Sequence, residues 1–204
     1  MLRLVIVACF LCLANNVLAE CECLWGGSFV DVQAATDLVV VGTIVSRRGN
    51  SVDIEVERRL RGDEEFSPLR VWLRTGDYCR PPVDIFPPGS EWVMALNRID
   101  TLPEGGFNPS TPNVSFGRVG DYSLSSCGGY FLERGGDWVS GNLVDAPRWE
   151  YQPQMTPVLL DLVAGHMEGR VSRESLKEAS QEDPALRELI LDTKAFLRNE
   201  NQVP

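Results

Sequence analysis

The chain has 204 residues, of which 44% are hydrophobic and 24% charged, so it is long enough to bury a core of its own. Its formal charge of −10 gives no electrostatic surface for nucleic acid or for an anionic membrane. We therefore expect the partner to be a protein or a glycan, and we expect neither nucleic acid nor membrane binding by the mature chain.

Residues 1–19 have the pattern of a signal peptide. The basic residue Arg3 precedes an apolar run over 4–14, which is too short to span a bilayer. The small residue Ala19 predicts cleavage before Glu20. Glu20 also occupies the place where a lipoprotein signal needs a small residue, so we expect no lipid anchor. The sequence predicts a secreted or periplasmic protein.

Export determines how the cysteines are counted. The mature chain keeps four, Cys21, Cys23, Cys79 and Cys127, and an even number in an oxidising compartment predicts two disulfides. A bond between Cys21 and Cys23 would close a strained ring, which leaves two pairings open. A zinc site of four thiolates is the rival hypothesis, but such sites usually carry Cys-x2-Cys pairs. We therefore expect no metal.

Up to about residue 143 the pattern is mainly β. Ser28 is a good N-cap for a short helix over 28–36, and residues 37–46 are apolar on both faces, as in a central strand. Alternating or apolar segments predict further strands over 52–57, 69–75 and 91–99. A long loop follows over 100–120, and then a hairpin over 129–143 that turns at Gly135-Gly136. These elements predict a small β-barrel with one helix near its start.

From residue 146 onward we expect a helical appendage that packs on the barrel. Thr156-Pro157 predicts the N-terminus of a helix over 158–167, followed by a short polar piece over 172–180. Asp183-Pro184 predicts the start of another helix over 185–200. Its apolar face carries Leu186, Leu189, Ile190, Phe196 and Leu197 at helical spacing.

Several motifs along the chain together match a known family. They are the Cys-x-Cys pair, the "ATDLVVVGTIVS" segment after the short helix, the "RRLRGD" turn, the lone Cys79 and the later "SSCGGYF". In this order they resemble the netrin-like domain of tissue inhibitors of metalloproteinases (TIMPs), in the form common among exported bacterial proteins. The resemblance covers residues 21–143 and leaves the tail unexplained. It implies an OB-fold-like five-stranded barrel over 20–145, with a helical appendage over 146–204, and disulfides Cys21–Cys79 and Cys23–Cys127.

The resemblance also implies a binding edge formed by Cys21, Glu22, Cys23 and Leu24. In TIMPs the first cysteine chelates the catalytic zinc of a protease through its α-amine and its carbonyl oxygen. Here a retained Glu20 would convert that amine into an ordinary amide, and the charge of Glu22 would resist burial in a protease pocket. We therefore expect a non-enzymatic module that binds an extracytoplasmic protein. Inhibition of a zinc metalloprotease is the second hypothesis.

A third hypothesis concerns the strand over 69–75. Trp72, flanked on its face by Arg70 and Arg74, has the composition of an aromatic platform for a sugar ring, a use known for OB-fold faces. It would make the protein a carbohydrate-binding OB module. The alternative, which we favour, is that the helical appendage covers Trp72.

The sequence offers little for catalysis. The single histidine, His166, lies at the end of an apolar helical run, so no two-histidine metal site exists. A Ser-His-Asp triad would have to be built from the appendage. If all four cysteines are bridged, none is left as a reactive thiol. We therefore predict no enzymatic activity, no catalytic residue and no cofactor.

Overall fold

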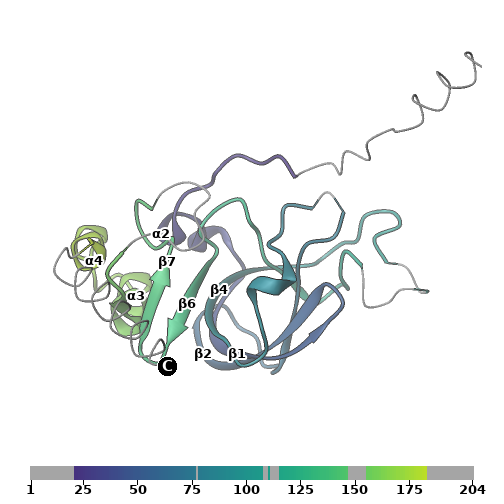
Figure 1. Cartoon of the computed structure of the whole chain (residues 1–204), viewed down its shortest axis with the longest axis horizontal. Helices are drawn as coiled ribbons and strands as arrows, with labels where there is room; N and C mark the ends of the chain where they lie inside the picture. The colour runs from purple at the N-terminus through teal and green to yellow at the C-terminus, as the bar shows by residue number, and fades with distance from the viewer. Residues whose placement is uncertain (1–20, 77, 108–109, 111–114, 147–154, 183–204) are drawn as a thin grey trace, which may run out of the picture.

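The structure is a computed structural model of the chain, shown in Figure 1, and it describes residues 21–76, 78–107, 110, 115–146 and 155–182. The predicted signal peptide over 1–19 and the predicted helix over 185–200 lie outside the described residues. Within the described ranges, no helix has the length and the apolar character that a membrane span requires.

The short helix near the N-terminus is confirmed. It consists of α2 (Phe29–Val32), continued by the 3-10 turn η1 (Gln33–Ala35). Ser28 is the N-cap, and its backbone N–H donates to Asp31 Oδ2 at 2.8 Å, in the manner of a capping box. The side chain of Phe29 is fully buried, which anchors the helix to the body of the protein.

The centre of the molecule is a closed five-stranded, OB-like β-barrel. Its strands, in the order of their pairing, are β1 (Leu38–Arg48), β2 (Ser51–Arg61), β3 (Leu69–Trp72), β5 (Tyr122–Ser123) and β4 (Glu91–Arg98). β4 pairs again with β1 and closes the ring, and all pairs are antiparallel except β3 with β5. Three register shifts between β1 and β2 are typical of bulges, which bend a strand around a small barrel.

Some boundaries differ from the sequence-based prediction. β2 continues through Arg61, so most of the "RRLRGD" segment, expected as a turn, is strand, and the connection to β3 spans 62–68. A 3-10 turn, η2 (Val83–Ile85), precedes β4, and the described residues of 100–120 form no helix or strand, as expected of the long loop. The two-residue strand β5 was not predicted, because two residues are too few to show an alternating pattern.

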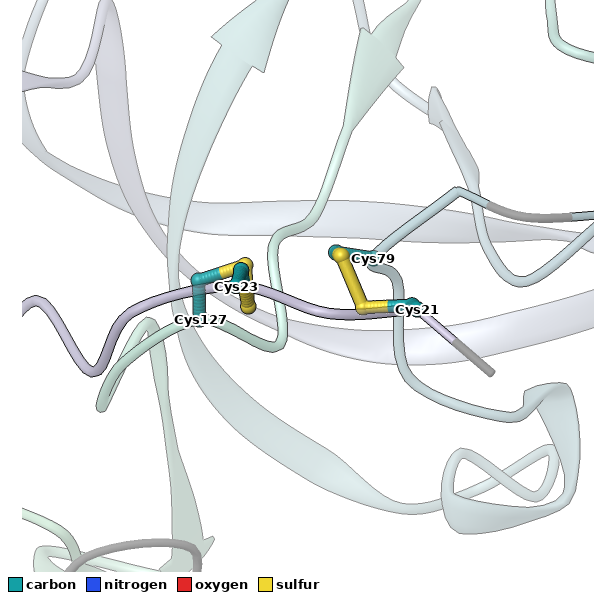
Figure 2. Close-up of side chains that lie close together, drawn as sticks. All are labelled: Cys21, Cys23, Cys79 and Cys127. Carbon is teal, nitrogen blue, oxygen red and sulfur yellow. A yellow bond between two sulfur atoms is a disulfide. The ribbon is translucent and has the colours of Figure 1, made fainter. Parts of the chain in front are cut away.

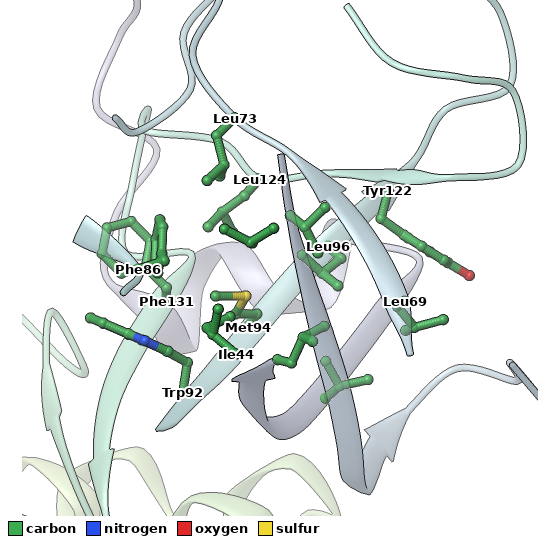
Figure 3. Close-up of a cluster of buried hydrophobic side chains, with 14 of the residues drawn as sticks. Ile44, Leu69, Leu73, Phe86, Trp92, Met94, Leu96, Tyr122, Leu124 and Phe131 are labelled. Carbon is green, nitrogen blue, oxygen red and sulfur yellow. The ribbon is translucent and has the colours of Figure 1, made fainter. Parts of the chain in front are cut away.

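The central strands β1 and β4 separate two hydrophobic cores. The barrel core, shown in Figure 3, contains a cluster in which Trp92, Phe86 and Phe131 meet edge to face, with ring centroids 4.8 to 5.9 Å apart. The outer core lies on the opposite face of the same two strands and includes Val39, Val41, Val93 and Ala95. The prediction that β1 is apolar on both faces is thus confirmed.

Three further strands extend the sheet from β4. They are β6 (Phe131–Gly135), β7 (Trp138–Gly141) and β8 (Val158–Leu159). The predicted hairpin between β6 and β7 is confirmed, but it turns one residue later than expected, at Gly136-Asp137. Gly136 has a φ of 63°, a left-handed conformation that favours glycine at this position.

The described part of the appendage packs on the barrel, as expected. Helix α3 (Leu160–Met167) and helix α4 (Arg173–Ser180) place Val163 and Leu176 in the outer core with no exposed surface. The prediction that a helix begins at Val158 is wrong, because Val158 and Leu159 pair with β7 as a strand. Leu159 becomes the N-cap, so Thr156 does not cap the helix.

Ion pairs also attach α4 to the N-terminal side of the molecule. Arg173 pairs with Asp31 of α2 and with Asp145, and Lys177 pairs with Asp145 at 2.6 Å. Hydrogen bonds from both cations lower the pKa of Asp145 to about 2. The α4 helix is therefore held by charge on its outer side and by Leu176 on its inner side.

Candidate binding edge

Two disulfides fix the start of the described chain, as Figure 2 shows. Cys21 is bonded to Cys79 and Cys23 to Cys127, with Cα–Cα distances of 5.0 and 5.8 Å. This is the pairing that the family resemblance implies, and it is confirmed. Cys79 follows β3 in a connecting segment, and Cys127 lies in the segment between β5 and β6. The N-terminal segment is thus attached to two separate loops of the barrel.

Glu22 and Leu24 lie on the solvent side of this segment. Residues 21–27 belong to no helix or strand, and exposure alternates along them. The cysteines are partly buried because they face the loops to which they are bonded, whereas Glu22 and Leu24 are exposed. Leu24 is 87% exposed, the highest value among the large hydrophobic residues that the structure describes. A backbone hydrogen bond from Gly26 N to Cys127 O, at 2.6 Å, adds a further attachment.

The loop that carries Cys79 is itself held by a buried cation. Arg80 is 5% exposed, and its guanidinium lies over the ring of Phe116, 4.2 Å from the centroid, and 5.5 Å from that of Tyr78. It also donates to the backbone oxygen of Phe116 at 2.5 Å. Burial lowers the pKa of Arg80 to about 10, so the guanidinium remains charged at neutral pH. The attachment point of Cys21 is therefore a packed loop.

The predicted aromatic platform on β3 is wrong at its central residue. Trp72 is only 1% exposed, and its Nε1–H donates to Asp121 Oδ2 at 2.7 Å. The loop before β5 covers the indole, since a Cβ placed on Gly117 would lie 3.1 Å from it. The cover therefore comes from this loop, whereas we expected it from the appendage. An indole in this position has no face available for a sugar ring.

The two arginines that flank Trp72 are also engaged within the protein. Arg70 forms an ion pair with Asp53, with Nε 2.8 Å from Oδ1. Burial by itself raises the pKa of Asp53, but hydrogen bonds from Arg70 and Ser46 outweigh it, so the net pKa is lowered. Arg74 donates to the backbone oxygen of Arg80 at 3.3 Å. Arg70, Trp72 and Arg74 therefore form no common binding face.

The four cysteines are also the one group of potential metal ligands found among the described residues. Their sulfur atoms all lie within 4.8 Å of one another. As two disulfides they carry no thiolate, and thiolate is the form that binds zinc. His166 lies apart from them at the end of α3, where its Nδ1 is 2.9 Å from the backbone oxygen of Val171. It joins the end of α3 to the residues that lead into α4.

A second exposed apolar site was not predicted. Trp138 on β7 and Leu159 on β8 are directly opposite each other, with exposures of 51% and 42%. The alternation of the predicted hairpin offered a signal for Trp138, because its neighbour Val139 is apolar and only one of the two can face the core. Leu159 gave no such signal, since its segment was expected to be helical.

Comparison of the chain with protein-family models, with curated proteins and with solved structures found no match in any of the three.

Proposed function

We propose that the protein is an exported, non-enzymatic binding module whose contact edge is the segment from Cys21 to Leu24. The observation that carries this proposal is the 87% exposure of Leu24 on a segment bonded to the barrel at Cys21 and Cys23. A large apolar side chain gains free energy when a partner removes it from water. The partner that fits is an extracytoplasmic protein with an apolar pocket.

The disulfides favour recognition through this segment because they reduce its freedom before binding. A loose N-terminus would lose conformational entropy when it docks, and that loss weakens affinity. Two bonds on alternate residues hold the intervening backbone, and they direct Glu22 and Leu24 outward. The backbone of 21–24 is not part of any sheet, so it is suited to pair with an extended segment of a partner.

Inhibition of a zinc metalloprotease is the second candidate function, and one observation favours it. Cys21 is tied to Cys79 at the same edge, so a free amine there would have a fixed position. An α-amine has a pKa near 8, which leaves a useful neutral fraction to bind a metal at neutral pH. This function requires that export removes Glu20 as well as residues 1–19. The exposed charge of Glu22 would then lie beside the metal.

The experiment that tests the proposal places a photo-crosslinking residue at position 24 of the exported protein. The matched control carries the same residue at Val45, which is 44% exposed on β1. We expect position 24 to capture one extracytoplasmic protein that position 45 does not. An excess of the Leu24→Asp variant, added as a competitor, should fail to suppress this capture. Equal capture at both positions, or none at position 24, would overturn the proposal.

The intact mass of the mature protein separates the two candidates. A mass that matches a chain beginning at Glu20, four hydrogens lighter than the reduced protein, means that both disulfides are formed and that no amino-terminal chelator is present. This result removes the inhibitor hypothesis. A mass that begins at Cys21 leads to a direct assay against zinc metalloproteases. We then expect inhibition by the chain that starts at Cys21 and none by a matched chain that starts at Glu20.

A further inference from the structure

The Trp138–Leu159 pair is an exposed apolar site at the end of the sheet. Trp138 on β7 lies directly opposite Leu159 on the adjacent strand β8, and β8 is the last strand in the pairing order. Their neighbours Val139 and Val158 are buried in the outer core on the opposite face. A pair of large apolar side chains beside a sheet edge is a site where another segment gains free energy by docking.

The chain leaves the described structure close to this pair. Thr156 donates two hydrogen bonds to the end of the appendage, from its backbone N–H to Ser180 O at 3.2 Å and from Oγ1 to Gln181 O at 2.6 Å. Thr156 is three residues before Leu159, a span of at most about 10 Å. The last described residues, 180–182, therefore lie near the β8 edge.

The sequence of residues 183–204 has the chemistry to cover this site. Its predicted helix over 185–200 is about 24 Å long at 1.5 Å per residue. Its apolar face, defined above by five residues, needs a partner surface, because short amphipathic helices are marginal in water without one. The first of these residues, Leu186, is five residues beyond Gln181, and an extended chain of that length reaches about 17 Å. The face can therefore reach the pair.

We propose that the apolar face of residues 185–200 docks on Trp138 and Leu159 of the same chain and covers the edge at β8. The arrangement is an internal cap. It leaves Leu24 at the N-terminal edge exposed and removes a second apolar site at which copies of the protein would associate. This inference rests on the contacts of Thr156 and does not depend on the proposed function.

Hydroxyl-radical footprinting of the mature chain tests the cap, with oxidation of Trp138 measured by peptide mass spectrometry. Three variants are compared with the unaltered protein: a chain that ends at residue 182, the double variant L189D/I190D on the apolar face, and the control E188Q/R198Q on the opposite face. Each variant is first checked for both disulfides by mass and for cooperative unfolding. We expect oxidation of Trp138 to rise several-fold in the shortened chain and in L189D/I190D, and to remain unchanged in the control.

Two results would overturn the proposal. Equal oxidation of Trp138 in the unaltered and shortened chains would mean that the tail does not cover it. Protection that disappears when the unaltered protein is diluted would mean that a second copy covers the site. Neither result affects capture at position 24, so failure of the cap and failure of the proposed binding edge are distinguishable.

Discussion

The two disulfides give the sharpest stability prediction. The bond Cys21–Cys79 closes a loop with a sequence separation of 58, and Cys23–Cys127 one of 104. In the chain-entropy model these loops correspond to about 4.2 and about 4.7 kcal/mol of unfolding free energy at 25 °C. We therefore expect C21S/C79S and C23S/C127S to lower the unfolding free energy by similar amounts. The second variant should be less stable than the first by about half a kcal/mol. Both losses are large relative to a typical total of about 5–15 kcal/mol.

Equilibrium unfolding in urea, followed by intrinsic tryptophan fluorescence, measures these losses. The unaltered protein unfolded with its disulfides intact is the reference, and the reduced protein is the control for complete removal of both bonds. A shift in midpoint without a change in slope would show that stability itself has changed. A loss below about 1 kcal/mol in either variant would refute the reasoning, since it would mean that the bond does not restrict the unfolded chain.

Three further predictions concern single residues. Trp72→Phe should lower the unfolding free energy by about 1–2 kcal/mol, measured in urea, because the partly buried Asp121 carboxylate loses its hydrogen bond at 2.7 Å and keeps its ion pair with Arg118; an unchanged midpoint would contradict this. Gly42→Ala should cost about 2–3 kcal/mol in the same assay, because its Cβ would lie 2.2 Å from the backbone oxygen of Glu55. Because the pKa of Asp145 is lowered to about 2, its contribution to stability is present above about pH 4 and is lost as the pH falls toward 2. Stability measured across that range should vary less with pH in Asp145→Asn than in the unaltered protein, and identical pH profiles would contradict the assignment.

The barrel strands were predictable because their side chains alternate between the buried core and water. Over 52–57 the apolar residues Val52 and Ile54 are fully buried, and Glu55 and Glu57 are exposed, as the alternation predicts. The exception is Asp53, which is 8% exposed because Arg70 on the adjacent strand neutralises it. Which arginine meets which aspartate depends on strand pairing, and a single strand carries no information on pairing.

The errors in the sequence-based site have a common physical cause. Trp72 lies on the face of β3 opposite to Val71, so alternation placed it outside the barrel. It is buried because a loop nearly fifty residues later supplies both Asp121 as a hydrogen-bond acceptor and a glycine that allows close approach. The strand at Val158–Leu159 was missed for a similar reason, since it exists only through its pairing with β7. Contacts between distant segments determined both outcomes.

The sharing of β1 and β4 between two cores has a consequence for where the chain can be divided. Val39, Val41, Val93 and Ala95 belong to barrel strands, yet they are buried in the core that α3 and α4 complete. A chain that ends near residue 145 would retain every barrel strand but would lose the outer-core residues Val158, Leu160, Val163 and Leu176, so part of that core would be open to water. We expect such a fragment to aggregate or to unfold with the barrel sequence intact. We therefore expect the barrel and the appendage to unfold as one cooperative unit.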